Sequence, residues 1–153
     1  MKIINASDLK SNLKINSPRE IFLDYLLSHS CTRKQAEEFL TRKNFNDINT
    51  ENLLHEAQQI GLIDDLAYAE LFAEGHLHWG NLKIAYELKN RGVEKNIIAQ
   101  ALNNIQSENE RAKNLYENWI HYLDEKKITA RLISRGFSKQ AVRSLNDNDG
   151  ISF

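Results

Sequence analysis

Two adjacent aspartates and two nearby histidines are the residues whose types best suit acid–base or metal chemistry. Asp64 and Asp65 stand beside a helix start, and neighbouring residues on a helix point in different directions. We therefore interpret them as the cap and dipole partner of that helix. His76 and His78 have no cysteine or third histidine in register, so we interpret them as exposed residues at a helix end rather than zinc ligands.

The single cysteine does not form a recognisable nucleophile. Cys31 precedes a helix start, which lowers the pKa of a thiol in some proteins, but the sequence places no histidine base beside it. The six glycines are scattered, so no glycine-rich phosphate loop is present. We therefore predict a protein that is not an enzyme and that has no catalytic residue, no metal site and no cofactor.

Basic residues are more informative, because they gather in three equivalent stretches of the chain. Eleven of the twenty lysines and arginines lie there: Arg33, Lys34, Arg42, Lys43, Lys83, Lys89, Arg91, Lys126, Lys127, Arg131 and Arg135. If equivalent helices line one side of the molecule, these residues form a stripe that suits a phosphate backbone or an acidic protein surface. The alternative is a solvated face with pairs four residues apart, such as Glu87–Arg91 and Glu38–Arg42.

One aromatic residue has two open roles. Trp79 stands with Gly80 where the apolar pattern of a helix breaks off. An exposed Trp79 adds to a binding surface, whereas a packed Trp79 is a wedge between helices. The sequence leaves both roles open.

The composition indicates a helical protein of the cytoplasm. Among 153 residues, 41% are hydrophobic and 27% are charged, with one proline, six glycines and a net charge of −1. One cysteine suits a reducing compartment. No apolar run approaches the ~20 residues that cross a bilayer, and the first residues lack the apolar core of a signal peptide.

A helix-ending pattern of leucine, two residues, a basic residue, glycine and an apolar residue recurs in the chain. It stands at Leu88–Val93 and Leu132–Phe137, with a looser copy at Leu40–Phe45. Glycine, or asparagine in the first copy, suits the left-handed residue after a helix, and the next apolar side chain then contacts the leucine. The last residues of the copies, at positions 45, 93 and 137, are 48 and 44 residues apart, which predicts tandem helical units.

The apolar stripes between these stops predict three helices per unit and an all-α fold. The units are 17–61, 62–106 and 107–146, with tails at 1–16 and 147–153. Apolar side chains such as Ile60 and Leu82 are assigned to the stripes of their helices. The first unit departs from the others, with an apparent insertion at 46–49.

Four segments resemble motifs of the RecX family of bacterial recombination regulators. Gly61–Ala69 resembles the family's Gly-x-x-Asp-Asp-x-x-Tyr/Phe-Ala signature. Ile84–Val93 resembles its Ile-x-x-Glu-Leu-x-x-Arg/Lys-Gly-Val/Ile segment, and Arg135–Phe137 matches the third unit. Thr32–Leu40 resembles a further helix, with threonine in place of serine. The resemblance runs over residues 18 to 145.

The resemblance implies three tandem three-helix repeats in an elongated, curved array. It also implies binding to the filament that the RecA recombinase forms on single-stranded DNA, with inhibition of ATP hydrolysis and strand exchange in recombination and DNA repair. The eleven basic residues are then candidates for contacts with RecA or with single-stranded DNA. We expect a monomer without a membrane partner.

Two other classes of function stay open from the sequence. One is an independent nucleic-acid-binding module, because short helix pairs joined by glycine turns resemble helix-turn-helix elements. It requires tight, salt-sensitive binding to naked DNA in the absence of RecA. The other is a scaffold for a different protein, which the repeat architecture fits equally well.

Overall fold

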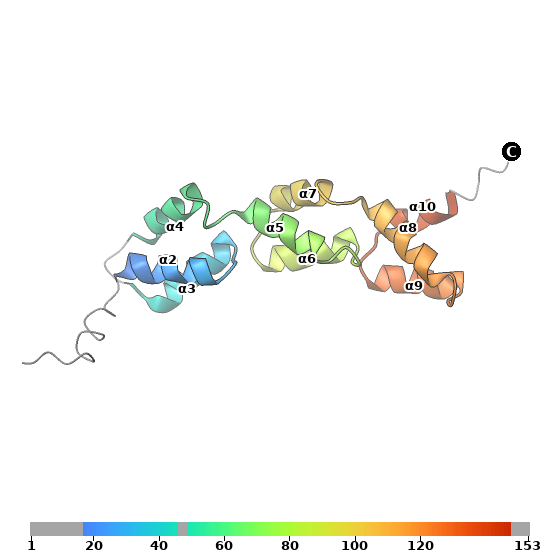
Figure 1. Cartoon of the computed structure of the whole chain (residues 1–153), viewed down its shortest axis with the longest axis horizontal. Helices are drawn as coiled ribbons and strands as arrows, with labels where there is room; N and C mark the ends of the chain where they lie inside the picture. The colour runs from blue at the N-terminus through green and yellow to red at the C-terminus, as the bar shows by residue number, and fades with distance from the viewer. Residues whose placement is uncertain (1–16, 46–48, 148–153) are drawn as a thin grey trace, which may run out of the picture. The chain divides into compact units, whose positions relative to one another are not determined.

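The structure is a computed structural model, and it describes residues 17–45 and 49–147. Within these residues it contains nine α-helices and no strand, which confirms the predicted all-α class (Figure 1). The chain divides into two compact units, with the boundary between Asp64 and Asp65. The predicted tail at 1–16, residues 148–153 of the predicted C-terminal tail and most of the predicted insertion at 46–49 lie outside the described residues. Asp147, which the sequence pattern assigns to the tail, is the last residue of the final described helix.

The first unit contains one core formed by three helices. These are α2 (Pro18–Ser28), α3 (Arg33–Lys43) and α4 (Thr50–Gln59). Phe22 from α2, Leu40 from α3 and Leu54 from α4 are almost fully buried together. The ring of Tyr25 stacks on the ring of Phe39, with 3.8 Å between their centroids. One buried stripe per helix is what makes three short helices stable together.

The helix ends of the first unit follow from local sequence. The Ser17 side chain accepts a hydrogen bond from the Glu20 N–H, which caps α2. The hydroxyl of Thr32 and the side chain of Gln35 cap α3 reciprocally. Helix α3 ends at Asn44, whose φ of 51° is in the left-handed region, as the pattern predicts.

The second unit contains six helices and two cores. The helices are α5 (Asp65–Glu74), α6 (Asn81–Asn90), α7 (Lys95–Asn103), α8 (Glu108–Trp119), α9 (Glu125–Ser134) and α10 (Lys139–Asp147). Ile84, Leu88 and other buried residues of α5, α6 and α7 form one core. Leu132, Phe137 and buried residues of α8, α9 and α10 form the other. With the core of the first unit, the described residues therefore form three successive three-helix cores.

Two helix stops in the second unit have the predicted geometry. Gly92 has a φ of 86° and Gly136 a φ of 84°, both in the left-handed region. The N–H of Val93 donates to the Leu88 carbonyl at 3.1 Å, and the N–H of Phe137 donates to the Leu132 carbonyl at 3.1 Å. These bonds close the left-handed helix end, and the two apolar pairs lie in the cores as expected.

Five apolar residues do not lie where the sequence pattern assigns them. The exposed side chains are Leu71 at 68%, Leu82 at 63%, Ile60 at 58%, Ile133 at 43% and Ile120 at 38%. In α6 the core side is set by Ile84 and Leu88, and a residue two positions before Ile84 points away from that side at ~100° per residue. Ile60 is the residue that ends α4, after its last turn. No helix in residues 17–45 and 49–147 is both long and apolar enough to cross a membrane.

Candidate binding surface at the junction of α6 and α9

The two cores of the second unit are joined where the end of α9 meets the beginning of α6. The N–H of Gly80 donates to the Arg135 carbonyl at 2.9 Å, and the N–H of Leu82 donates to the Gly136 carbonyl at 3.1 Å. The first N–H groups and the last carbonyls of helices lack partners within their own helix. Here the two ends supply each other's partners, with the helix dipoles in a favourable head-to-tail order.

Glycine is required on both sides of this junction. A Cβ atom at Gly80 would overlap the backbone of Gly136 and Phe137, and one at Gly136 would overlap Lys83. Gly80 has an ordinary φ of −77°, so it is needed for close approach rather than for an unusual backbone conformation. The sequence identifies Gly80 only as a break in a pattern, because no spacing reveals which backbone lies opposite.

A glutamate of a third helix, α8, binds both sides of the junction. The carboxylate of Glu108, at the start of α8, accepts hydrogen bonds from the N–H of Asn81 at 3.1 Å and the N–H of Ser138 at 2.9 Å. It also accepts one from the Ser138 hydroxyl at 2.9 Å. Hydrogen bonds to an ionised acceptor are the stronger kind. Glu108 therefore ties the beginnings of α6, α8 and α10 together.

A buried arginine completes this network. Arg111 is only 2% exposed, and its guanidinium donates to the carbonyls of Trp79 and Gln106 and to the side-chain oxygen of Asn81. Burial lowers the pKa of Arg111, and the charge of Glu108 acts in the opposite direction. No sequence pattern considered above singles out this residue. The available signal is its spacing of four and eight residues from Leu115 and Trp119, which puts it on the stripe that packs into the core.

Three of the predicted basic residues lie over tryptophan rings beside this junction. The ammonium of Lys83 lies 4.2 Å from the ring centroid of Trp79. The guanidinium groups of Arg131 and Arg135 lie 5.1 Å and 5.0 Å from that of Trp119. We call these five residues the tryptophan–cation cluster. Within the described residues, none of its three cations forms an ion pair with a carboxylate.

The unpaired cations have a clear electrostatic consequence. A cation over an aromatic face keeps its full positive charge, while its position is restricted by the ring. Trp119 is 7% exposed and thus a rigid support, whereas Trp79 is half-buried. The ring of Trp79 packs against the core of its unit and also lies under the ammonium of Lys83, and its role in a binding surface stays a prediction.

Two histidines and a phenylalanine extend the cluster along the end of α5. The ring of His76 stacks on that of Trp79 with 4.1 Å between centroids, and its Nδ1 lies 2.6 Å from the Phe72 carbonyl oxygen. His78 is exposed, as predicted, whereas His76 is half-buried. Partial burial lowers the pKa of His78, and the positive charges of Arg135, His76 and Lys83 lower it further.

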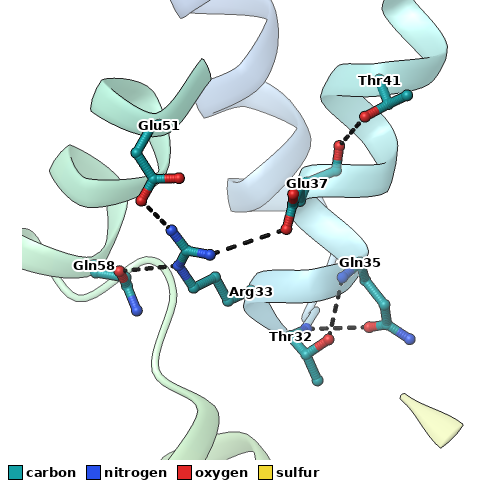
Figure 2. Close-up of polar contacts among 7 residues, drawn as sticks. All are labelled: Thr32, Arg33, Gln35, Glu37, Thr41, Glu51 and Gln58. Atoms are coloured by element: carbon teal, nitrogen blue, oxygen red, sulfur yellow. Dashed lines mark hydrogen bonds and ion pairs between the residues drawn. The ribbon is translucent and has the colours of Figure 1, made fainter. Parts of the chain in front are cut away.

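Two other predicted basic residues are engaged within their own units. Arg33 pairs with Glu51, approaches Glu37 at 3.9 Å and donates to Gln58 at 3.3 Å, so it links α3 to α4 (Figure 2). Arg91 pairs with Glu87 at 2.8 Å, which confirms one predicted pair four residues apart. The hydrogen bond that Arg91 donates to the Glu87 carboxylate raises the pKa of Arg91. Carboxylates thus offset both charges.

The remaining predicted basic residues are exposed and lie on both units. Lys34, Arg42 and Lys43 belong to α3, and the Lys43 ammonium lies 5.5 Å from the ring centroid of Phe39. The second predicted pair, Glu38–Arg42, does not form an ion pair in this described helix. The others are Lys89 at the end of α6 and Lys126 and Lys127 at the start of α9. The structure therefore brings only Lys83, Arg131 and Arg135 to the junction.

Comparison with protein families identifies one part of the chain directly. Residues 64–102 match the family model described as RecX, second three-helix domain. These residues include α5, α6 and all of α7 except Asn103, and hence the Lys83 and Trp79 side of the tryptophan–cation cluster.

Curated relatives extend the similarity along most of the chain. Regulatory protein RecX of Chlorobium phaeobacteroides is 28% identical over 135 residues, which cover 76% of this chain and 82% of that protein. The same-named protein of Prosthecochloris aestuarii is 28% identical, with 82% of this chain and 88% of that protein covered. The relative from Amycolatopsis mediterranei is 29% identical over 107 residues, and this match spans 61% of its length.

The fold also matches a solved structure. The crystal structure of RecX from Lactobacillus salivarius superposes with a TM-score of 0.70 at 22% identity, covering 96% of this chain and all of that one. At this identity the similarity concerns the fold. The matched domain, the curated relatives and the fold agree, and the chain is similar over most of its length to the RecX regulatory proteins.

Proposed function

We propose that this protein binds the RecA filament on single-stranded DNA and inhibits its ATP hydrolysis and strand exchange. The family name supports a regulatory role, and the family resemblance supplies RecA as the target. The observation that carries the proposal on this chain is the tryptophan–cation cluster. Three cations without carboxylate partners on a fixed junction suit an acidic surface or a phosphate backbone.

The proposed mechanism is inhibition by differential binding. A regulator that binds one filament state more tightly shifts the filament toward that state, by no more than its difference in affinity. Basic residues on both units give further, weaker contacts, and several contacts on a repeating filament raise the overall affinity. Arg33 and Arg91 contribute less than the cluster, because their charges are offset by Glu51 and Glu87.

The test is single-stranded-DNA-dependent ATP hydrolysis by the cognate RecA, titrated with this protein. We expect inhibition at amounts below one protein per RecA. The double variant Lys83→Glu with Arg131→Glu should need roughly tenfold more protein for the same inhibition, because each reversal places a repulsive charge at the contact. Arg131 is exposed and Lys83 is half-buried, so helicity should persist.

The matched control reverses two other exposed lysines of the second unit, Lys113→Glu and Lys139→Glu. It changes the net charge equally, so an equal loss of inhibition would refute a role for the cluster.

The alternative function is an independent nucleic-acid-binding module. It is favoured if the protein leaves RecA unaffected but binds naked single-stranded DNA with a strong salt dependence.

A further inference from the structure

A second surface of the second unit is an open groove between α6 and α7. The groove is lined by Leu82, Ala85, Tyr86, Lys89, Val93, Lys95 and Ile98. Val93 and Ile98 form its buried floor, and they also belong to the core beneath. The groove is therefore supported by packed residues rather than by a loop.

Two large side chains stand exposed along this groove. Leu82 and Tyr86 are each 63% exposed and lie one helical turn apart on α6. They point away from the core side of the helix, which Ile84 and Leu88 occupy. Neighbouring exposed apolar side chains beside an apolar groove are typical of a surface that binds another protein.

The charges at the rim indicate the chemistry of the partner. Lys89 in the last turn of α6 and Lys95 in the first turn of α7 are exposed, and neither pairs with a carboxylate among the described residues. Two acids are nearby. Glu94 is exposed beside Lys95, and Glu87 is engaged by Arg91. The balance at the rim is positive, which favours acidic side chains in the occupant.

The lining favours a protein segment over a nucleic acid. Leu82, Ala85, Val93 and Ile98 have no side-chain donor for a phosphate or a base edge, and only Tyr86 offers a ring for stacking. Aliphatic pockets suit the apolar face of an amphipathic helix, whose anchors recur every three or four residues.

We propose that this groove binds an amphipathic, acidic helical segment of a protein partner. Apolar side chains of that segment lie between Leu82 and Tyr86, over Val93 and Ile98. Its carboxylates face Lys89 and Lys95. The inference rests on the proposed function only in that it gives the regulator a contact with protein, separate from the tryptophan–cation cluster.

The test uses a synthetic helix-forming peptide of leucine and glutamate and the isotope-labelled full chain, without RecA. We expect the peptide to shift the backbone resonances of Leu82, Tyr86 and Ile98. Leu82→Asp with Tyr86→Ser should weaken binding by at least roughly tenfold. Central apolar anchors carry most of the affinity of such an interface, and these substitutions remove two of them. Both residues are exposed, so the fold should survive. The control Leu71→Asp alters a leucine that is 68% exposed on α5, and it should leave binding unchanged.

A second variant tests the rim charge. Lys89→Glu with Lys95→Glu should abolish binding of the glutamate peptide and favour a matched leucine–lysine peptide. Shifts elsewhere, equal binding of both peptides by the parent protein, or binding of an oligothymidine in the same groove would overturn the inference. RecA is absent from these titrations, so their failure leaves the ATP hydrolysis test unaffected, and the reverse also holds.

Discussion

At the scale of single residues, the basic side chains of the junction differ in burial and in their partners. Arg111 is buried and binds backbone carbonyls, whereas Arg131 and Arg135 rest on Trp119 with their charges unopposed. The sequence pattern identified the last two as binding candidates, because they recur in equivalent stretches. It did not identify Arg111, because the partners that make its burial tolerable come from segments about 30 residues away.

His78 should report the positive field of the cluster. The folded protein holds its pKa below the ordinary value of 6.5, so in acid it binds fewer protons than the unfolded chain. Its contribution to stability is therefore full above pH 6.5 and falls as the pH decreases toward the folded-state pKa. Proton NMR titration of the imidazole, with the urea-unfolded chain as reference, measures this shift.

Arg135→Gln provides the matched test, because it removes a charge that lowers the pKa of His78. We expect that pKa to rise in the variant, and to rise in the parent protein when a single-stranded oligonucleotide binds at the cluster. An unchanged titration midpoint in both experiments would contradict the electrostatic description of this surface.

At the scale of helices, local sequence signals predicted where a helix ends better than which side of it faces the core. The stops at Asn44, Gly92 and Gly136 follow from the residue types alone, because the left-handed residue and its apolar neighbour are adjacent in sequence. Leu82 and Ile60 were assigned to buried stripes and are exposed, because a short helix contains too few turns for spacing alone to fix its core side. The end-to-end contact of α9 and α6 has no local signal.

Gly80→Ala should destabilise the second unit although its backbone angles suit alanine. The added Cβ would overlap backbone atoms of Gly136 and Phe137, which cannot move aside as a side chain can. We expect a loss of about 3 kcal/mol in the free energy of unfolding, at the upper end for overpacking. Urea unfolding followed by circular dichroism measures it.

Gly75→Ala is the matched control for that substitution. A Cβ at Gly75 would meet only the carbonyl oxygens of Leu71 and Phe72, at an ordinary 3.5 Å. Its effect should stay within about 1 kcal/mol. Equal effects of the two substitutions would mean that the junction of α9 and α6 is not closely packed in solution.

At the scale of the whole molecule, residues 17–45 and 49–147 form three cores, whereas the chain divides into two compact units. The predicted boundaries of the three repeats remain a prediction. The second and third cores share a unit because Glu108 and Arg111, both from α8, bind the beginning of α6. Interactions of this kind make neighbouring repeats unfold together, since neither retains its hydrogen bonds alone.

Both tryptophans of the chain lie in the second unit, and they report this cooperativity because Trp79 packs against one core and Trp119 belongs to the other. With 5-fluorotryptophan incorporated, we expect the fluorine resonances of Trp79 and Trp119 to disappear at the same urea concentration. Arg111→Ala should lower the urea midpoint of both resonances. We expect the free energy of unfolding to decrease by at least about 2 kcal/mol, because several buried acceptors lose their donor. Separate midpoints in the parent protein would show that the two cores unfold independently.

The junction of α9 and α6 also gives two backbone N–H groups hydrogen-bond partners that the beginning of a helix normally lacks. First-turn amides of a helix have no intrahelical partner and normally exchange their hydrogens with solvent quickly. The N–H groups of Gly80 and Leu82 instead bind carbonyls of Arg135 and Gly136. Their protection from deuterium therefore depends on α9 alone, and these two amides act as intrinsic reporters of separation of the two repeats while both helices remain folded.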